Sequence, residues 1–129
     1  MKKNELRRIK NDMKVFYYLR TCNTCQRILT SLQLPIEVER REIKSLALTG
    51  EELDAMQELS GTYEALFSKR SRLYQQRGLK NQNLSENEIK DLLLEHYTFL
   101  KRPILIWEEH IFIGNSKNTI DAAYELIHG

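Results

Sequence analysis

The stretch Val15–Cys25, which reads VFYYLRTCNTC, decides the fold that this sequence predicts. Its first five residues are aliphatic or aromatic, a composition typical of a short buried strand. Residues 20–23 break that run, and from Thr24 the apolar residues recur at helical spacing until Pro35 stops the helix. The sequence therefore predicts a strand and a helix that meet at a C-x-x-C motif.

Segments farther along the chain complete a mixed sheet. Mixed alternation over residues 36–43 predicts a second strand, parallel to the first because a helix-length connection separates them. Apolar runs at 104–107 and 110–113 predict a β-hairpin, although Glu-Glu is poor turn chemistry. A final helix is expected after Ser116. The order β-α-β followed by β-β-α predicts an α/β protein with a thioredoxin-like mixed sheet.

The residues between these halves predict a helical insertion at about 49–98. Capping boxes that begin at Thr49 (TGEE) and Ser85 (SENE) predict the starts of two helices. Gly61 is expected to end the first of them, and residues 62–77 are expected to continue as further helix.

The composition fits one globular domain. The chain has 129 residues, of which 41% are hydrophobic and 29% are charged, close to the average for such domains. No window approaches 18 consecutive apolar residues, and residues 1–14 contain no apolar signal segment. We therefore expect no membrane interaction and a cytoplasmic location.

The formal charge of +2 is unevenly distributed. Residues 1–14 carry six Lys or Arg and two acids, a net charge of +4, which leaves −2 on the other 115 residues. We divide the chain into a basic extension at 1–13, expected to be solvated, and a domain at 14–129. The acidic balance of that domain gives no support for direct nucleic-acid binding.

The two cysteines, Cys22 and Cys25, lie where the first predicted strand gives way to the first predicted helix. Unpaired backbone N–H groups and the positive end of the helix dipole stabilise a thiolate at such a place. Because the thiolate is the reactive form, we predict that Cys22 is a nucleophile. Cys25 lies in the same turn and is predicted to resolve a mixed disulfide at Cys22.

Other interpretations of the cysteine pair stay open. Cys25 can be a buried helix residue that takes no part in chemistry. A zinc site needs about four ligands, and three scattered histidines with no second C-x-x-C argue against one, so no metal is expected. A structural disulfide is disfavoured in a reducing compartment.

Two sets of cations are the other candidate site residues. Five basic residues and no acid fall between residues 69 and 80, among them Lys69 and Arg70. They form either a positive binding face or a solvated helix surface. Arg102 precedes Pro103 at the entry to a strand, a loop that lies across from the active thiol in thioredoxin-like folds. An arginine at that place can stabilise a thiolate or hold an oxyanion.

These residues together resemble the ArsC/Spx family, which contains arsenate reductases and Spx transcriptional regulators. The resemblance spans about residues 14–128 and rests on the C-x-x-C unit with the SKRS run at 68–71 and the KRPI run at 101–104. It implies that Cys22 is the redox cysteine and that Pro103 is the cis proline of the family. It also implies that the anionic substrate is bound by three cations, Arg102, Arg70 and Lys69, together with Pro103.

The resemblance implies, first, a thiol-dependent oxidoreductase similar to arsenate reductases. Such an enzyme would act on a small thiol or oxyanion, hold no bound cofactor, and take electrons from glutathione–glutaredoxin or thioredoxin. Arsenate reductases of this type place arginines where Ser68 and Gly114 stand, and Ser-Arg where Cys25 and Gln26 stand. This chain therefore keeps Arg102 as the matching oxyanion arginine.

The alternative that the resemblance implies is a Spx-like, redox-switched regulator. In Spx, the glycine that matches Gly61 belongs to the surface that binds the C-terminal domain of the RNA polymerase α subunit. A glycine at this position also suits a helix C-cap. A redox-inert scaffold of the same family is the third interpretation.

Overall fold

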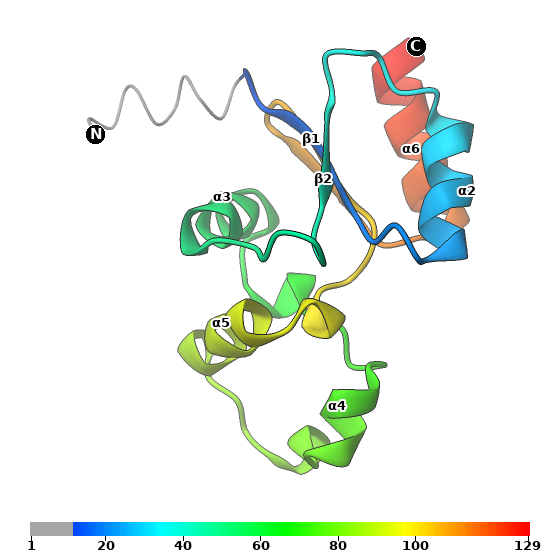
Figure 1. Ribbon diagram of the computed structural model, residues 1–129. Coiled ribbons are helices and arrows are strands. Elements are labelled where there is room, and N and C mark those ends of the chain that lie inside the picture. The colour runs from blue at the N-terminus through cyan, green and yellow to red at the C-terminus, as the bar shows by residue number, and fades with distance from the viewer. Residues whose placement is uncertain (1–11) are drawn as a thin grey trace. The chain divides into compact units, whose positions relative to one another are not determined.

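The computed structural model describes residues 12–129 (Figure 1). The predicted basic extension at 1–13 therefore lies outside the described residues, apart from Asp12 and Met13. The described chain divides into two compact units, one formed by residues 12–42 and 102–129 and the other by residues 43–101. Each unit is described by itself.

The first unit is built on a four-stranded mixed sheet in the order β2-β1-β3-β4. β1 pairs in parallel with β2 and antiparallel with β3, which in turn pairs antiparallel with β4. The strands are β1 (Lys14–Tyr18), β2 (Glu39–Glu42), β3 (Ile104–Trp107) and β4 (His110–Ile113). The predicted order of elements along the chain, the parallel pairing of β1 with β2 and the hairpin of β3 and β4 are confirmed. β2 is shorter than the predicted 36–43, because its first residues form a turn instead.

Two helices of the first unit, α2 (Asn23–Leu32) and α6 (Lys117–His128), lie side by side against one face of this sheet (Figure 1). Phe16 of β1 and Leu105 of β3 are directly opposite each other and share the face that the helices cover. These two residues form one buried cluster with four others: Ile28, Leu32, Val38 and Ala123. Burial of this apolar surface holds α2 on the sheet and so fixes where α2 begins.

The second unit is helical. It contains α3 (Gly50–Ser60), α4 (Arg72–Gln76) and α5 (Glu86–Glu95), with single 3₁₀ turns at Glu64–Leu66, Leu79–Asn81 and Tyr97–Phe99. Both predicted capping boxes are present, since Thr49 and Ser85 each exchange two hydrogen bonds with the glutamate three residues on. Gly61 ends α3 as predicted, with a φ of 95° that favours glycine.

The prediction of continuous helix over 62–77 is wrong. Phe67 adopts an extended conformation and forms a β-bridge with Leu100, and Ser68 N–H donates to the Phe99 carbonyl at 2.7 Å. A new helix starts only at Ser71, whose hydroxyl accepts from Tyr74 N–H at 3.2 Å. Contacts with residues about 30 positions away in the sequence therefore override local helix propensity.

Aromatic residues form the centre of the second unit. Phe67 stacks on Phe99 with ring centroids 5.5 Å apart and meets Tyr74 edge-on at 5.8 Å. Arg77 lies 5.7 Å from the Phe99 ring and binds Glu95 through two hydrogen bonds of 2.6 and 3.0 Å. These contacts tie α4 to α5 and the turn that follows it.

Among residues 12–129, none of the helices combines the length and the apolar composition that crossing a bilayer requires.

Candidate functional site

Cys22 occupies the cap position of α2, between the end of β1 and the first helical turn. Its φ and ψ of −90° and 112° are extended, while its carbonyl already accepts a hydrogen bond from Gln26 N–H at 3.1 Å. Its own N–H donates to the Leu19 carbonyl at 3.0 Å, which closes a tight turn after the strand. The sulfur is thereby placed at the end of the helix where the backbone N–H groups have no carbonyl partners.

The surroundings of Cys22 favour its thiolate. Burial opposes ionisation, but the N–H and thiol groups of Cys25 and the positive charge of Arg102 outweigh it, so the pKa of Cys22 is lowered. The N–H of Thr24 acts in the same direction. The Cys22 side chain makes no capping hydrogen bond of full geometry, so these N–H groups act on the charged sulfur as an electrostatic effect. Cys22 is also partly exposed and can meet a substrate.

Cys25 has the opposite environment. Its side chain is completely buried, and that burial, together with the neighbouring Cys22, raises the pKa of the Cys25 thiol to about 11. The two cysteines come within 3.5 Å of each other, and both are free thiols. The site therefore combines one accessible thiol that ionises easily with one sheltered thiol that keeps its proton.

Arg102 and Pro103 reach the same place through the sheet. The register pairs Tyr17 of β1 with Ile104 of β3, so the residues before Ile104 lie beside those that follow β1. The Arg102–Pro103 peptide bond is cis, as the resemblance implies, and the Pro103 carbonyl accepts from Gly114 N–H at 2.9 Å. This geometry leaves the charge of Arg102 close enough to lower the pKa of Cys22.

Two residues that the sequence analysis did not single out hold the loop between β1 and Cys22. Gln26 Nε2 donates to the Arg20 carbonyl at 3.0 Å, and Arg20 N–H donates to a Glu42 carboxylate oxygen at 2.9 Å. Glu42 lies opposite Tyr18 in the parallel β1–β2 register, so its closeness to residue 20 follows from the pairing. The register of β2, had it been known, would have revealed this contact.

The structure brings four predicted site residues together in the first unit: Cys22, Cys25, Arg102 and Pro103. The others, Gly61, Lys69 and Arg70, belong to the second unit. Lys69 forms a long ion pair of 3.9 Å with Glu64, and both side chains are mostly exposed. Arg70 is exposed, and Gly61 is an exposed helix cap. The anion-binding and partner-binding roles predicted for these three residues stay predictions.

Within the described part of the chain, no three His, Cys, Asp or Glu side chains are grouped as metal ligands would be. The reactive groups that the structure brings together are the two thiols and the arginine. A thiolate beside a guanidinium can attack a disulfide or an oxyanion, and a second thiol within reach can displace what the first has bound.

Comparisons of the sequence and of the structure with known proteins point to the same family. The sequence pattern of the ArsC family matches residues 17–123. The Global transcriptional regulator Spx 2 of Bacillus anthracis is 31% identical over 105 residues, which cover 79% of each chain. Such coverage means that the similarity includes both units.

Solved structures show that this is a thioredoxin-like fold of the ArsC type. An ArsC-family-related protein from Bacteroides fragilis superimposes with a TM-score of 0.71 at 26% identity, covering 86% of this chain and 98% of that one. A Streptococcus mutans protein described as a "possible arsenate reductase" superimposes with a TM-score of 0.65 at 28% identity, covering 84% and 98%. The predicted fold class is confirmed.

Proposed function

Because the chain belongs to the ArsC family, we propose that it is a thiol-dependent, arsenate reductase-like oxidoreductase. In this proposal Cys22 is the nucleophile and Cys25 is the resolving thiol. The observation that carries it is the cysteine pair, whose members approach to 3.5 Å and have pKa values shifted in opposite directions. Such a pair is typical of a redox centre, and a buried cysteine without chemistry has no need of it.

The first step is an attack by the Cys22 thiolate. On arsenate, a sulfur–arsenic bond forms and one oxygen leaves as water after it takes up a proton. On a disulfide substrate, the thiolate forms a mixed disulfide and the displaced sulfur leaves as a thiolate. Arg102 stabilises the negative charge in either case, because its planar guanidinium offers two parallel donors to an oxyanion. Lys69 and Arg70 are the further cations that the family resemblance assigns to the anion.

The second step belongs to Cys25. Its sulfur attacks the Cys22 sulfur, a disulfide forms, and the bond from Cys22 to the substrate breaks with its electron pair. With arsenate the pair stays on arsenic, so arsenate(V) becomes arsenite(III) while two thiols become one disulfide. Dihydrogen arsenate, two thiols and one proton give arsenous acid, a disulfide and water. An external thiol donor, glutathione–glutaredoxin or thioredoxin, then reduces the Cys22–Cys25 disulfide by exchange.

The pKa values give the two steps their order. While Cys22 is a thiolate, it raises the pKa of Cys25 by its charge and by accepting a hydrogen bond. Once the Cys22 sulfur is covalently bound to a substrate, it has lost that charge, so part of the cause of the raised pKa disappears. Cys25 therefore becomes more easily ionised after Cys22 has reacted, which is when a resolving thiolate is needed.

The direct test is an arsenate reduction assay of the full chain, with glutathione–glutaredoxin and with thioredoxin as separate donors. We expect turnover with one of them, complete loss in Cys22→Ser, and an accumulated adduct on Cys22 in Cys25→Ser. Arg102→Gln removes the charge that stabilises the anion. Arg27→Gln is its matched control, because Arg27 is an exposed arginine of α2 that is not among the groups that lower the pKa of Cys22. An enzyme that shows neither arsenate reduction nor exchange with a small disulfide would contradict the proposal.

A second candidate function is supported by the Spx relatives. Regulators of this kind are about 30% identical to the chain over 79–84% of its length. As a regulator, the protein would use the Cys22–Cys25 pair as a redox switch, and Gly61 would belong to a surface for the C-terminal domain of the RNA polymerase α subunit. The helix-cap geometry of Gly61, with a 2.7 Å bond from its N–H to the Gln57 carbonyl, accounts for a glycine here without any partner.

Binding to that isolated polymerase domain separates the two functions. The regulator predicts a complex whose affinity differs between the reduced and oxidised chain and is lost in Gly61→Arg. Gly61→Asn, which tolerates the left-handed conformation better, serves as the folding control. No complex in either redox state would eliminate the regulator and leave the oxidoreductase. If Cys22→Ala changes neither activity nor binding, both candidates fail and a redox-inert scaffold remains.

A further inference from the structure

The second unit contains a pocket that lies within a single short segment of the chain. It is open to solvent and has a volume of about 720 Å³. It is lined by six residues between positions 69 and 81: Lys69, Tyr74, Gln75, Gly78, Lys80 and Asn81. All six belong to the unit formed by residues 43–101. The volume falls within the range of roughly 300–1,000 Å³ that is usual for small-molecule sites.

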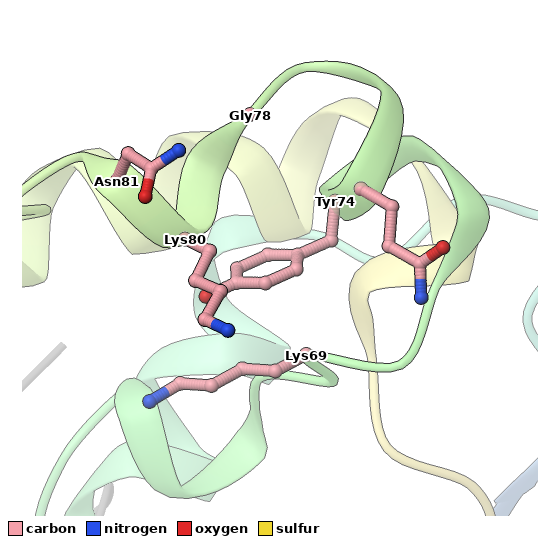
Figure 2. A pocket seen from close by; sticks show the side chains of 6 residues that line it. Lys69, Tyr74, Gly78, Lys80 and Asn81 are labelled. Carbon is pink, nitrogen blue, oxygen red and sulfur yellow. The ribbon is translucent and has the colours of Figure 1, made fainter.

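The path of the chain creates this pocket. Gly78 has a φ of 63°, a left-handed conformation that turns the chain sharply between α4 and the 3₁₀ turn Leu79–Asn81. The turn carries Lys80 and Asn81 back toward Tyr74. The Tyr74 ring is itself fixed, because it is buried and meets Phe67 edge-on. Figure 2 shows the side chains of Lys69 and Lys80 next to this ring.

The pocket is positively charged. None of its six lining residues is acidic, and two are lysines. Within residues 12–129 the Lys80 ammonium has no ion pair or hydrogen bond, and the Lys69 ammonium has only the exposed 3.9 Å pair with Glu64. An ion pair of that length on the surface contributes little, so both charges are available to a ligand. By contrast, Glu95 neutralises the nearby Arg77.

We propose that this pocket binds a small molecule that carries two adjacent phosphate groups. Lysine ammonium groups bind phosphate oxygens as point charges. Because the pocket has two ammonium groups, it suits a ligand that carries more negative charge than a single carboxylate. The side-chain amides of Gln75 and Asn81 offer further donors and acceptors. The pocket gives Lys69 a partner, Lys80, that the family resemblance does not include.

The experiment is a titration of the full-length chain with inorganic pyrophosphate and, separately, with ADP. Calorimetry measures the affinity, and two-dimensional ¹H–¹⁵N NMR locates the site. We expect saturable binding with backbone shifts concentrated in residues 69–81. Loss of one charged contact should weaken binding roughly tenfold in Lys80→Gln and by a similar factor in Lys69→Gln.

Arg72→Gln is the matched control, because Arg72 is an exposed cation of the same segment that does not line the pocket. It should change the affinity by no more than about twofold through general electrostatics. An equal loss in Arg72→Gln and Lys80→Gln would overturn the proposal in favour of a diffuse basic surface. NMR shifts confined to residues 1–14, or an absence of saturable binding, would also overturn it. So would tighter binding of a short DNA duplex, if each cation of the segment contributes to that binding.

The Lys80 variant separates the pocket from the proposed function, whereas Lys69 belongs to both proposals. Lys80→Gln should leave arsenate reduction and disulfide exchange unchanged, because Lys80 has no part in the Cys22 chemistry. Loss of pyrophosphate binding with full reductase activity supports the pocket alone. Pyrophosphate binding with no reductase activity supports the pocket and contradicts only the function proposed for the cysteines.

Discussion

The start of α2 differs from the start of every other α-helix within residues 12–129. α3, α4, α5 and α6 each begin at a serine or threonine whose hydroxyl accepts a hydrogen bond from the backbone of the first turn. α2 begins at Cys22, which makes no such hydrogen bond. α2 is a regular helix without a hydroxyl cap. The two kinds of helix start therefore differ in the group that the free N–H groups of the first turn stabilise: a hydroxyl oxygen in the other helices and the Cys22 sulfur in α2.

The cap position of a helix can therefore contribute either to stability or to the reactivity of a side chain. A hydroxyl at the cap position satisfies the N–H groups permanently and contributes stability. A thiol at the same position leaves them for a charge that appears only when the proton leaves, so part of the stabilisation goes to the reactive form. Substitutions at the caps and around the two thiols should therefore separate stability from reactivity.

Replacing Cys22 with serine should convert the start of α2 into an ordinary cap. We expect complete loss of the fast alkylation by iodoacetamide and of any thiol exchange, because Cys25 is buried and protonated. The free energy of unfolding should stay the same or rise by up to about 1 kcal/mol, because serine is a good cap. Alkylation by mass spectrometry and urea unfolding measure the two effects. Fast alkylation that persists in Cys22→Ser would show that Cys25 is the reactive thiol.

The raised pKa of Cys25 predicts a loss of stability at alkaline pH. The buried thiol keeps its proton up to about pH 11, whereas in the unfolded chain it ionises near pH 8.5–9. Stability is therefore unaffected below about pH 8.5 and falls as the pH rises toward 11. The pKa rises by about two units, from 9.0 to about 11, and at 1.36 kcal/mol per unit the expected loss is about 3 kcal/mol.

Urea unfolding at several pH values measures that loss, and Cys25→Ala is the control. The alanine variant starts from a lower stability because it leaves a small cavity, but it should lack this part of the pH slope. Identical slopes between pH 8.5 and 11 in both proteins would contradict the assignment of a raised pKa to Cys25.

Removing a hydroxyl cap should cost stability where removing the thiol does not. Ser85→Ala deletes one side of the capping box of α5 and should lower the free energy of unfolding by about 1 kcal/mol. Cys22→Ala, measured in the same way, should change it by less, because Cys22 makes no capping hydrogen bond. Equal losses in the two variants would mean that the sulfur caps α2 as effectively as a hydroxyl caps α5.

Arg102→Gln should have the smallest effect on the thiol. The pKa of Cys22 should rise, since a favourable positive charge is lost, while the N–H and thiol groups of Cys25 still act against the effect of burial. The pH dependence of the alkylation rate reports this pKa. Arg27→Gln should leave it unchanged. A Cys22 pKa in Arg102→Gln at or above the ordinary value would make Arg102 the dominant cause.

The sequence predicted the first unit well because its signals are local and consistent. Strand, turn and helix around Cys22 follow from residue type and spacing. In the second unit the same holds for the starts of α3 and α5, which the capping boxes at Thr49 and Ser85 predicted. The hairpin formed despite its Glu-Glu turn, with Glu108 at a φ of 56°, because the pairing of β4 with the buried strand β3 outweighs the cost of that conformation.

The features that the sequence did not predict depend on contacts between residues distant in the sequence. The predicted helix at 62–77 is broken by the Phe67–Leu100 bridge, which no local sequence pattern indicates. The link from Arg20 to Glu42 requires the register of β2, and the pocket around Tyr74 requires the path of the chain after Gly78. The part played by Lys69 and Arg70 beside Cys22 stays a prediction, since they belong to the other unit.

The close approach of the two cysteines has a consequence for oxidation if Cys22 is the reactive thiol that we propose. A peroxide converts an accessible thiolate into a sulfenic acid, and further oxidation to sulfinic or sulfonic acid is irreversible in most proteins. Cys25, within 3.5 Å, would condense with a sulfenic acid on Cys22 and release water, which leaves a disulfide that a thiol donor can reduce. In that case the sheltered cysteine would protect the exposed one from irreversible oxidation.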